Sequence, residues 1–541
     1  MNAPLLEPSG LEVTDVHWER IQLVLRIRRR QDIGAQLDAG DVHLRPANGH
    51  QPTLASRPVV GAIGPDERLV RFNVFAGHDQ MPLAQGTWQV VLRRPGATRE
   101  WTAIPGSVEL KLKEPMREFI SGGATYRVNL AADDGAPLDV TISTEAPDRP
   151  SLRSPRTLIA WLRALPRQAW LHLFGLLLTI VHGLPFRRPL IVFTSDSRTS
   201  LSGNLKFVHD RIIERGLDRQ FRLATIFKAS IRLRRPLRDR ARFVWLLARA
   251  HVILVEDYQP AIYRLPRRSD QRIIQLWHAW GAFKTVGYSR IGKSWGPNPY
   301  SSVHKNYTYA TVSSTHEVPF YAEAFGIPDE HVVPTGTPRM DDFLDPSRQA
   351  ERREAAYTAI PGTRDREVIL FAPTFRGGSA RRARYPVDLI DLDAANALCV
   401  ERNATLIFKM HPFVRRRVDI PDEYRDRLID VSDLPVETND LLLITDLLIT
   451  DYSSIVFEYS TQGRPMLFYA FDLEEYIATR DFYVPFEDFV PGRIVRTFDE
   501  LVDAIRREDY QLEKVAPFAA RHLPAGNGTA TDRIIDELIL S

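Results

Sequence analysis

The stretch that decides the fold is ITDLLITDYSSIVFEYSTQGRPMLFYAFDLEEY, residues 444–476. An apolar run ends at Asp451, the polar corner Tyr452-Ser453-Ser454 follows, and a helix-like segment leads into a second apolar run. This order of strand, turn, helix, turn and strand is typical of a parallel α/β sheet. The corner places two hydroxyls and free backbone N–H groups where a helix begins, which favours a bound anion. Two interpretations are open: the serines cap the helix, or they form a phosphate site. If the motif stood alone in the sequence, the helix cap would be favoured.

The composition is that of an ordinary globular protein, with 44% hydrophobic and 26% charged residues. A chain of 541 residues is too long for one core, so we expect two or three domains. The net charge of +3 argues against a general nucleic-acid binder. The single cysteine, Cys399, excludes a disulfide framework within the chain and suits a reducing compartment. The N-terminus has no basic segment followed by an apolar one, so the expected location is the cytoplasmic side of the membrane.

Residues 1–150 are predicted to form a β-rich accessory domain, sandwich-like or built of two small β-units, because short apolar or alternating runs lie between turn-forming residues. This region shows no catalytic constellation. Contact with an acceptor or glycan, assembly, and a purely structural role all remain open for it. The expected strands are residues 21–27, 68–76, 87–94, 108–113, 125–132 and 138–143.

Residues 151–189 combine apolar and aromatic side chains with flanking arginines. The cleanest apolar stretch, residues 170–184, is about 15 residues long and falls short of the roughly 20 that span a bilayer. It is expected either to lie in the membrane interface as a basic amphipathic segment or to pack as a buried helix. Residues 151–251 carry about twenty Lys and Arg against about five Asp and Glu, which favours an anionic membrane surface as a partner. Nucleic acid is not predicted as a partner, because no recognised binding motif appears.

Strands and helix-length segments alternate from residue 190 onward, which predicts two Rossmann-like α/β domains facing a cleft. The first is expected over residues 190–345 and the second over residues 346–541, and the final helix is a candidate to return to the first domain. Several strands end in polar residues, and ligands in open parallel sheets lie beyond the carboxyl ends of strands. The strand ends in question are Ser195-Asp196, Glu256-Asp257, His278 and Ser313-Ser314.

Three motifs carry candidate chemistry. In LWHAWGAFK, His278 follows a strand and precedes Lys284; an imidazole there suits a general base, although a lone histidine is more often structural. In FAPTFRGG, a strand ends before a hydroxyl and a guanidinium that match phosphate oxygens. In FKMHP, Lys409 and His411 share one strand face, and His411 is either a phosphate donor or a satisfied core histidine.

The sequence lacks a GxxxxGK[ST] loop and a GxGxxG turn after the first strand of either α/β unit, which disfavours a P-loop nucleotidase and a nicotinamide dehydrogenase. No cluster of His, Cys and Asp is typical of a metal site, so no metal is predicted.

Taken in this order, the motifs resemble the CDP-glycerol glycerophosphotransferase family, which includes teichoic acid primases and polymerases. The resemblance covers roughly residues 190–540 and rests on residues 275–288, 334–344, 369–376, 408–412 and 449–492. It implies a GT-B-like fold, with an acceptor-side first domain and a CDP-donor-binding second domain. It implies transfer of glycerol phosphate from CDP-glycerol to a hydroxyl of a lipid-linked or polymeric acceptor, with release of CMP and with no metal or further cofactor.

The resemblance also assigns roles. His278 would be the base for the acceptor hydroxyl, and His411 would donate to the donor phosphates. The family pattern WHG-T-x-x-K departs here to Ala279-Trp280-Gly281-Ala282 after His278, which leaves the acceptor open. The predicted substrate-binding residues are Lys284, Thr374, Arg376, Lys409, Asp451, Ser453 and Ser454.

Two alternatives are kept. One is a GT-B transferase that uses CDP-ribitol or a nucleotide sugar to build a cell-wall or capsular polymer. The other is a non-catalytic protein that binds a surface polymer through the β-rich region. In every enzymatic version the expected location is peripheral, on the cytoplasmic side of the membrane.

Overall fold

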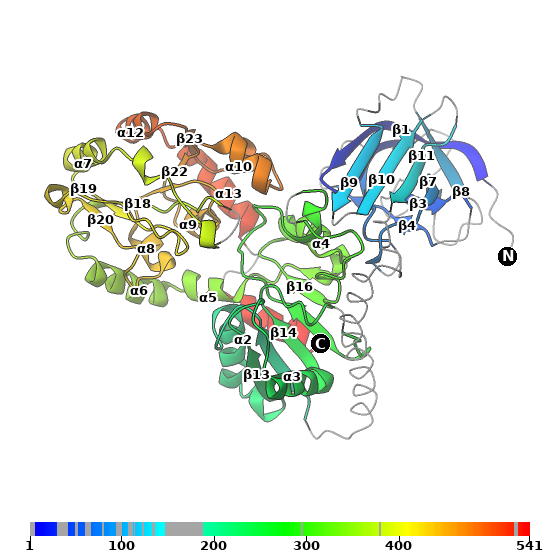
Figure 1. Ribbon diagram of the computed structural model, residues 1–541, viewed down its shortest axis with the longest axis horizontal. Coiled ribbons are helices and arrows are strands. Elements are labelled where there is room, and N and C mark those ends of the chain that lie inside the picture. Colours follow the sequence, from blue (N-terminus) through cyan, green and yellow to red (C-terminus); the bar gives the residue numbers. More distant parts are fainter. Residues whose placement is uncertain are drawn as a thin grey trace, which may run out of the picture.

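The described part of the chain forms three sheets, each in a unit of its own (Figure 1). A β-rich unit is followed by two α/β units, which confirms the predicted fold class. Most of the predicted interfacial segment, residues 151–187, lies outside the described residues. The computed structural model describes residues 6–29, 42–48, 52–59, 67–77, 80–93, 100–105, 112, 114–121, 124–132, 136–145, 188–263, 265–293, 296–377, 380–523 and 528–541.

The β-rich domain is one eleven-stranded sheet around a single hydrophobic core. Alternation places Tyr126, Val128 and Leu130 of one strand in that core, while their neighbours face outward. Five of the six predicted strands are present; the sixth, residues 108–113, is described only at Leu112. The strands are β1 (Leu6–Glu19), β2 (Gln22–Arg29), β3 (Val42–Pro46), β4 (Leu54–Ala55), β5 (Arg57–Pro58), β6 (Glu67–Asn73), β7 (Gly86–Arg93), β8 (Glu100–Pro105), β9 (Met116–Ser121), β10 (Ala124–Ala131) and β11 (Asp139–Glu145).

This β-rich domain packs against the first α/β domain. Tyr288 and Ile291, from the first α/β domain, are buried in the core of the β-rich domain. Arg20 adds an ion pair, with 2.8 Å between its Nε and Oε1 of the buried Glu323, and it also donates to the carbonyl of Tyr483 at 3.1 Å. Arg20 therefore contacts both α/β domains from the β-rich side.

The first α/β domain has a parallel sheet in the order β13-β12-β14-β15-β16-β17. Its central strands are apolar and buried on both faces, as a parallel sheet covered by helices requires. The order reverses between β12 and β14, so the loops after these two strands diverge and leave room for a ligand. The elements are β12 (Leu190–Ser195), α2 (Gly203–Glu214), β13 (Arg222–Phe227), α3 (Leu237–Arg249), β14 (Ala250–Val255), β15 (Arg272–Gln275), β16 (Tyr309–Thr311), α4 (Val318–Phe325), β17 (Val332–Val333) and α5 (Pro338–Leu344).

The second α/β domain has a parallel sheet in the order β20-β19-β18-β21-β22-β23, the Rossmann order, with its reversal between β18 and β21. Residues 444–476 supply β21, α9 and β22, as their pattern predicts. The elements are α6 (Pro346–Ala359), β18 (Glu367–Phe371), α7 (Leu392–Glu401), β19 (Ala404–Phe408), β20 (Leu428–Asp430), α8 (Thr438–Ile444), β21 (Leu447–Thr450), α9 (Ile455–Ser460), β22 (Met466–Tyr469), α10 (Leu473–Arg480), α11 (Phe486–Phe489), β23 (Arg493–Val495), α12 (Phe498–Arg506) and α13 (Val515–His522).

The last helical segment returns to the first α/β domain. Helix α14 (Ala530–Ile534) continues into a π-helical turn (Ile535–Ile539), and its apolar side chains are buried with those of β12, α2 and β14. Figure 1 shows this red segment against the green first domain. Arg211 of α2 forms a two-point ion pair with Asp532, at 2.9 and 2.8 Å. The end of the predicted second domain therefore belongs to the first.

Within the described ranges, no helix is long and apolar enough to cross a membrane.

Candidate active site

His278 lies at the carboxyl edge of the first sheet, in the loop after β15, and its Nδ1 pairs with Oδ1 of Asp257. Asp257 follows β14, the neighbouring strand, and also accepts a hydrogen bond of 2.9 Å from the hydroxyl of Ser197, which follows β12. Burial acts to raise the pKa of Asp257, but the hydrogen bonds from His278 and Ser197 outweigh it and leave that pKa below its ordinary value. The carboxylate therefore stays ionised beside an imidazole that is about half exposed, at 48%.

A second carboxylate stands behind this pair. Glu256 is buried, and its Oε1 accepts a 2.5 Å hydrogen bond from Arg198. Burial raises the pKa of Glu256 to about 7, even though Arg198 acts in the opposite direction. Arg198 also lies 3.8 Å from Asp257, so one guanidinium serves both acids.

The backbone before His278 is held in an unusual conformation. Trp277 has a φ of 50° although it is buried and bulky, a conformation that costs on the order of 1–3 kcal/mol and persists only where the surroundings hold it. Two contacts impose it here: its N–H donates to Gln275 at 2.9 Å, and its carbonyl accepts from the Asn204 side chain at 2.7 Å. The imidazole is therefore positioned by a fixed turn.

Asp451 organises the carboxyl edge of the second sheet, at the order reversal between β18 and β21. Its Oδ1 accepts from the backbone N–H of Thr374 at 2.7 Å and from that of Tyr452. Its Oδ2 accepts from Arg376 at 2.7 Å. Asp451 is 1% exposed, so it holds the corner together and does not face a ligand.

Arg376 is committed to the same framework. Its guanidinium forms a two-point ion pair with Asp472, at 2.6 and 2.8 Å, and lies over the rings of Tyr452 and Tyr476. Four of its five N–H groups donate inside the protein. The structure therefore places Arg376 and Thr374 as supports of the corner.

The two serines of the corner keep free capacity. Ser454 begins α9, but its hydroxyl makes no capping hydrogen bond. The Ser453 hydroxyl oxygen accepts a long contact of 3.5 Å from the N–H of Ile455. Both serines are partly exposed, so their hydroxyls are placed to donate to a ligand. Side-chain capping does not account for this corner.

His411 follows β19, beside the corner, between the rings of Phe375 and Phe413, whose centroids lie 4.7 and 4.9 Å from its own. Its Nδ1 accepts a 3.1 Å hydrogen bond from the N–H of Phe413. Burial lowers the pKa of His411, and the charge of Lys284 lowers it further. The neutral ring therefore carries its proton on Nε2 and presents a hydrogen-bond donor.

The two predicted lysines differ. Lys284 comes from the first domain, but its backbone pairs with Phe482 of the second, and its ammonium lies 5.6 Å from the Tyr476 ring. Its charge acts to lower the pKa of His411; at Asp451 the same charge opposes the larger effect of burial, which leaves the pKa of that carboxyl raised. Lys409 instead donates to the carbonyls of residues 431 and 434, at 3.1 and 3.4 Å, and anchors a loop.

A contact between the domains, which the sequence did not single out, connects the two edges. The backbone N–H of Arg339 donates at 3.1 Å to Asn204, the residue that holds the Trp277 carbonyl. The Arg339 guanidinium pairs with buried Glu458 of α9, the helix that follows the serine corner. The position of His278 is thereby connected to the position of the serines. Sequence analysis named Asp257 as part of a polar strand end but gave it no role in the site.

In the part of the chain that the structure describes, no group of three His, Cys, Asp or Glu side chains is arranged to hold a metal ion.

Two Rossmann-type domains with contacts between them, each with a histidine at its strand edge, define a protein of the GT-B fold class. The chain belongs to the CDP-glycerol:poly(glycerophosphate) glycerophosphotransferase family, whose model matches residues 176–540. The resemblance inferred from the motifs is thus confirmed.

Named relatives agree with this assignment. The teichoic acid ribitol-phosphate polymerases TarK and TarL of Staphylococcus aureus (strain NCTC 8325 / PS 47) are 49% and 47% identical, over 65% and 64% of this chain. These matches cover 68% of TarK and 62% of TarL, so the chain spans about two thirds of their length. The solved structure of the wall teichoic acid polymerase TagF superposes with a TM-score of 0.54 at 20% identity, covering 71% of this chain and 97% of TagF, and shows the shared fold.

Proposed function

We propose that the protein transfers an alditol phosphate from a CDP-alditol to a hydroxyl of a polymeric or lipid-linked acceptor and releases CMP. The observation that carries the proposal is the position of Lys284. The backbone of this first-domain residue pairs with that of Phe482 in the second domain, and its ammonium lies 5.6 Å from the centroid of the Tyr476 ring. Its charge also acts to lower the pKa of His411, which supports a shared site at the two strand edges. The family and the teichoic acid polymerases among its relatives support this chemistry.

In the proposed reaction, Nε2 of His278 removes the proton of the acceptor hydroxyl as its oxygen attacks phosphorus. Asp257 holds Nδ1–H and stabilises the imidazolium that forms. The bond from this phosphorus to the bridging oxygen breaks, and CMP leaves with the electron pair. The His411 Nε2–H, the two serine hydroxyls and the Lys284 ammonium stabilise the negative charge on the phosphate oxygens.

Ribitol phosphate is the transferred group that we favour, because TarK and TarL are named as ribitol-phosphate polymerases. Sequence analysis predicted glycerol phosphate and kept ribitol as an alternative. The family name retains glycerol phosphate as the competitor.

The test is a donor panel of CDP-ribitol, CDP-glycerol and a UDP-sugar with a lipid-linked acceptor. We expect CMP release and a lengthened product with CDP-ribitol, and slower release with CDP-glycerol. Release of UMP or UDP, or no CMP release from either CDP-alditol, would contradict the proposed chemistry. The reverse preference between the two CDP-alditols would overturn only the choice of ribitol.

The proposal also places the protein peripherally on an anionic membrane surface, on the cytoplasmic side. Support comes from the loop before α3 and from α3 itself, where large apolar side chains are exposed: Ile231, Leu233, Leu237 and Trp245, at 45%, 55%, 80% and 43%. Arginines alternate with these residues, and apolar groups beside cations are typical of surfaces that bind anionic lipid.

Vesicle co-sedimentation tests this location. Changing Leu233 and Leu237 to Asp is expected to reduce binding to vesicles that contain anionic lipid at least severalfold. The matched control changes Leu434 and Leu512 to Asp, since these exposed leucines lie in the second domain. Equal binding of the variant with Asp at positions 233 and 237 and of the wild type would argue against a role of this surface in membrane binding.

A further inference from the structure

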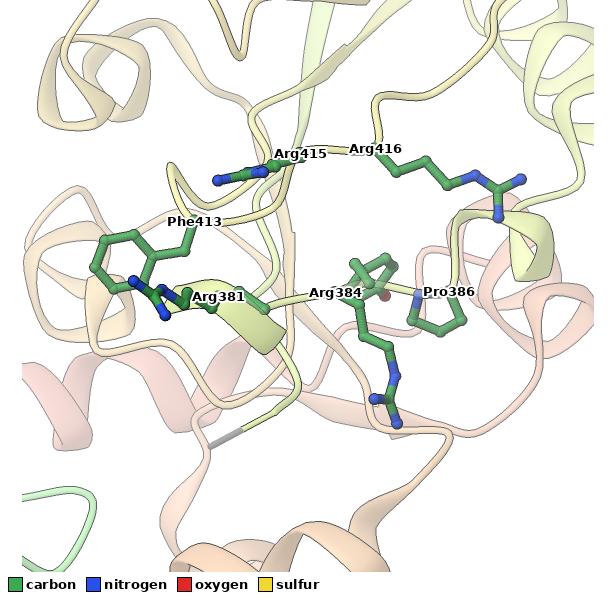
Figure 2. A pocket seen from close by; sticks show the side chains of 8 residues that line it. Arg381, Arg384, Pro386, Phe413, Arg415 and Arg416 are labelled. Carbon is green, nitrogen blue, oxygen red and sulfur yellow. The ribbon is translucent and has the colours of Figure 1, made fainter. Parts of the chain in front are cut away.

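A pocket of about 440 Å³ lies beside the second-domain edge of the site. Its described lining comes from residues 381–386, after β18, and residues 413–416, after β19. Figure 2 shows the guanidinium groups of Arg381 and Arg415 on the side where the Phe413 ring lies, and that of Arg416 on the opposite side. Four of the eight lining side chains are arginines.

Most of this positive charge is uncompensated. Arg416 is paired with Asp388 at 2.6 and 2.5 Å. Arg381, Arg384 and Arg415 are exposed, and their side chains form no hydrogen bond or ion pair with any described residue. Adjacent like charges repel one another, so the arrangement favours an anion that joins them. Guanidinium groups match phosphate oxygens through paired hydrogen bonds.

The rest of the described lining contains no acid that would repel a phosphate. The described lining includes no carboxylate or amide side chain that would accept from the amino group of cytosine. It does include Tyr385, which is 3% exposed and whose hydroxyl has no hydrogen-bond partner among the described residues.

The pocket is continuous with the candidate site. Phe413 lines the pocket, contacts the His411 ring and donates its N–H to His411 Nδ1. On the other loop, the backbone of Arg384 pairs with that of Arg376, at 2.8 and 3.0 Å. Arg376 in turn supports the corner at Asp451. An extended ligand that begins at His411 can therefore pass directly into the pocket.

We propose that this arginine pocket binds phosphodiester groups of a poly(alditol phosphate) chain, behind the chain end that reacts. The inference rests on the proposed function, which makes such a polymer the acceptor and product. A polymer presents one negative charge in each unit, so several phosphates meet several guanidinium groups together. The CDP donor carries only a diphosphate, and His411, Lys284 and the serine corner already serve that group.

The test compares two triple variants with the same change of charge. The pocket variant carries Arg381→Gln, Arg384→Gln and Arg415→Gln. The control carries Arg348→Gln, Arg425→Gln and Arg507→Gln, at exposed arginines elsewhere in the second domain. For each protein, equilibrium titration measures the Kd for purified poly(ribitol phosphate) and for CDP, and a transfer assay measures product length.

The pocket variant is expected to bind the polymer at least about tenfold more weakly, because charge-assisted contacts to several phosphates are lost. Its affinity for CDP stays within about twofold, its products become shorter, and the control matches the wild type. Unchanged polymer affinity, or an equal loss for CDP and polymer, would overturn the proposal; the second result would mark a nucleotide pocket. If the wild type binds the polymer, the pocket variant loses that binding and no CDP-alditol is consumed, then the proposed function fails while the polymer site stands.

Discussion

The two strand edges of the site differ in how they use their charges. At the first-domain edge, an ionised Asp257 faces a half-exposed His278, so a carboxylate stabilises an imidazole that gains a proton. At the second-domain edge, Asp451 and Asp472 both pair with Arg376. Among the described residues, no acid acts on the pKa of His411. The first-domain edge is therefore arranged to accept a proton, and the second-domain edge to donate hydrogen bonds to an anion.

The largest effect is expected when the base is removed. His278→Ala should reduce CMP release by about 10³- to 10⁴-fold, since general base catalysis and the positioned His–Asp pair are both lost. The measurement is CMP release under single-turnover conditions. His17→Ala is the matched control, because His17 pairs with Asp15 at 2.9 Å in the β-rich domain, away from the site. Near-normal release by the His278 variant would refute its assigned role.

Arg376→Met probes the framework of the other edge. Removing one partner of a buried ion-pair network leaves Asp451 and Asp472 uncompensated, so we expect the second domain to lose roughly 3–5 kcal/mol of stability. Thermal unfolding measures it. Arg417→Met breaks a more exposed pair with Asp433 and should cost no more than about 1 kcal/mol. Equal losses in the two variants would show that the corner is not a cooperative framework.

Asp257→Asn tests whether the acid serves the histidine. Asn fits the positive φ of 66° at this position but carries no charge to stabilise the imidazolium. We expect kcat to fall by about 10²-fold, while the affinity for CDP stays unchanged. A loss of CDP affinity with little change in kcat would show that Asp257 serves donor binding. That result would contradict the separate roles of the two edges.

A smaller, pH-dependent effect is expected at His304, a buried residue of the first domain. Burial lowers the pKa of His304 to about 3, so the folded state keeps it neutral while the unfolded chain protonates it below its ordinary value of about 6.5. Stability is therefore lost as the pH falls from about 7 toward 3, and the contribution between pH 7 and 5 is about 2 kcal/mol.

His304→Asn removes this titration, and Asn tolerates the positive φ of 64°. The melting temperature of the wild type should fall by about 5 °C relative to that of the variant between pH 7 and 5. If the melting temperatures of the two proteins fall equally between pH 7 and 5, His304 does not contribute to the pH dependence of stability.

Sequence reasoning located the strand ends well, because an apolar run followed by polar residues is a local signal. It named His278, His411 and the corner of Ser453 and Ser454 as candidates, and all of them lie at the edges of the two sheets. It predicted that Arg376 binds a phosphate, because the sequence shows the charge of this residue but not the side chains that surround it. Asp472, which accepts two of its hydrogen bonds, lies 96 residues further along the chain.

The same limit explains the other differences. Lys409 faces backbone carbonyls of the adjacent strand's loop, and nothing in FKMHP indicates them. The pairing of Asp257 with His278 depends on β14 and β15 being neighbours in the sheet, which is a property of topology and not of either motif. The role of residues 151–189 stays a prediction, because most of that segment lies outside the described residues.

The measurement that tests the central claim most directly is the Kd of CDP for His278→Ala and His411→Ala, determined by equilibrium titration beside the wild type. The division between the two edges predicts that the His278 variant binds CDP within about twofold of the wild type, although its transfer of alditol phosphate is about 10³- to 10⁴-fold slower. It predicts that the His411 variant binds CDP about tenfold more weakly, because a hydrogen bond to a charged phosphate is lost. Equal affinities in the two variants, or weaker binding by the His278 variant, would contradict the account.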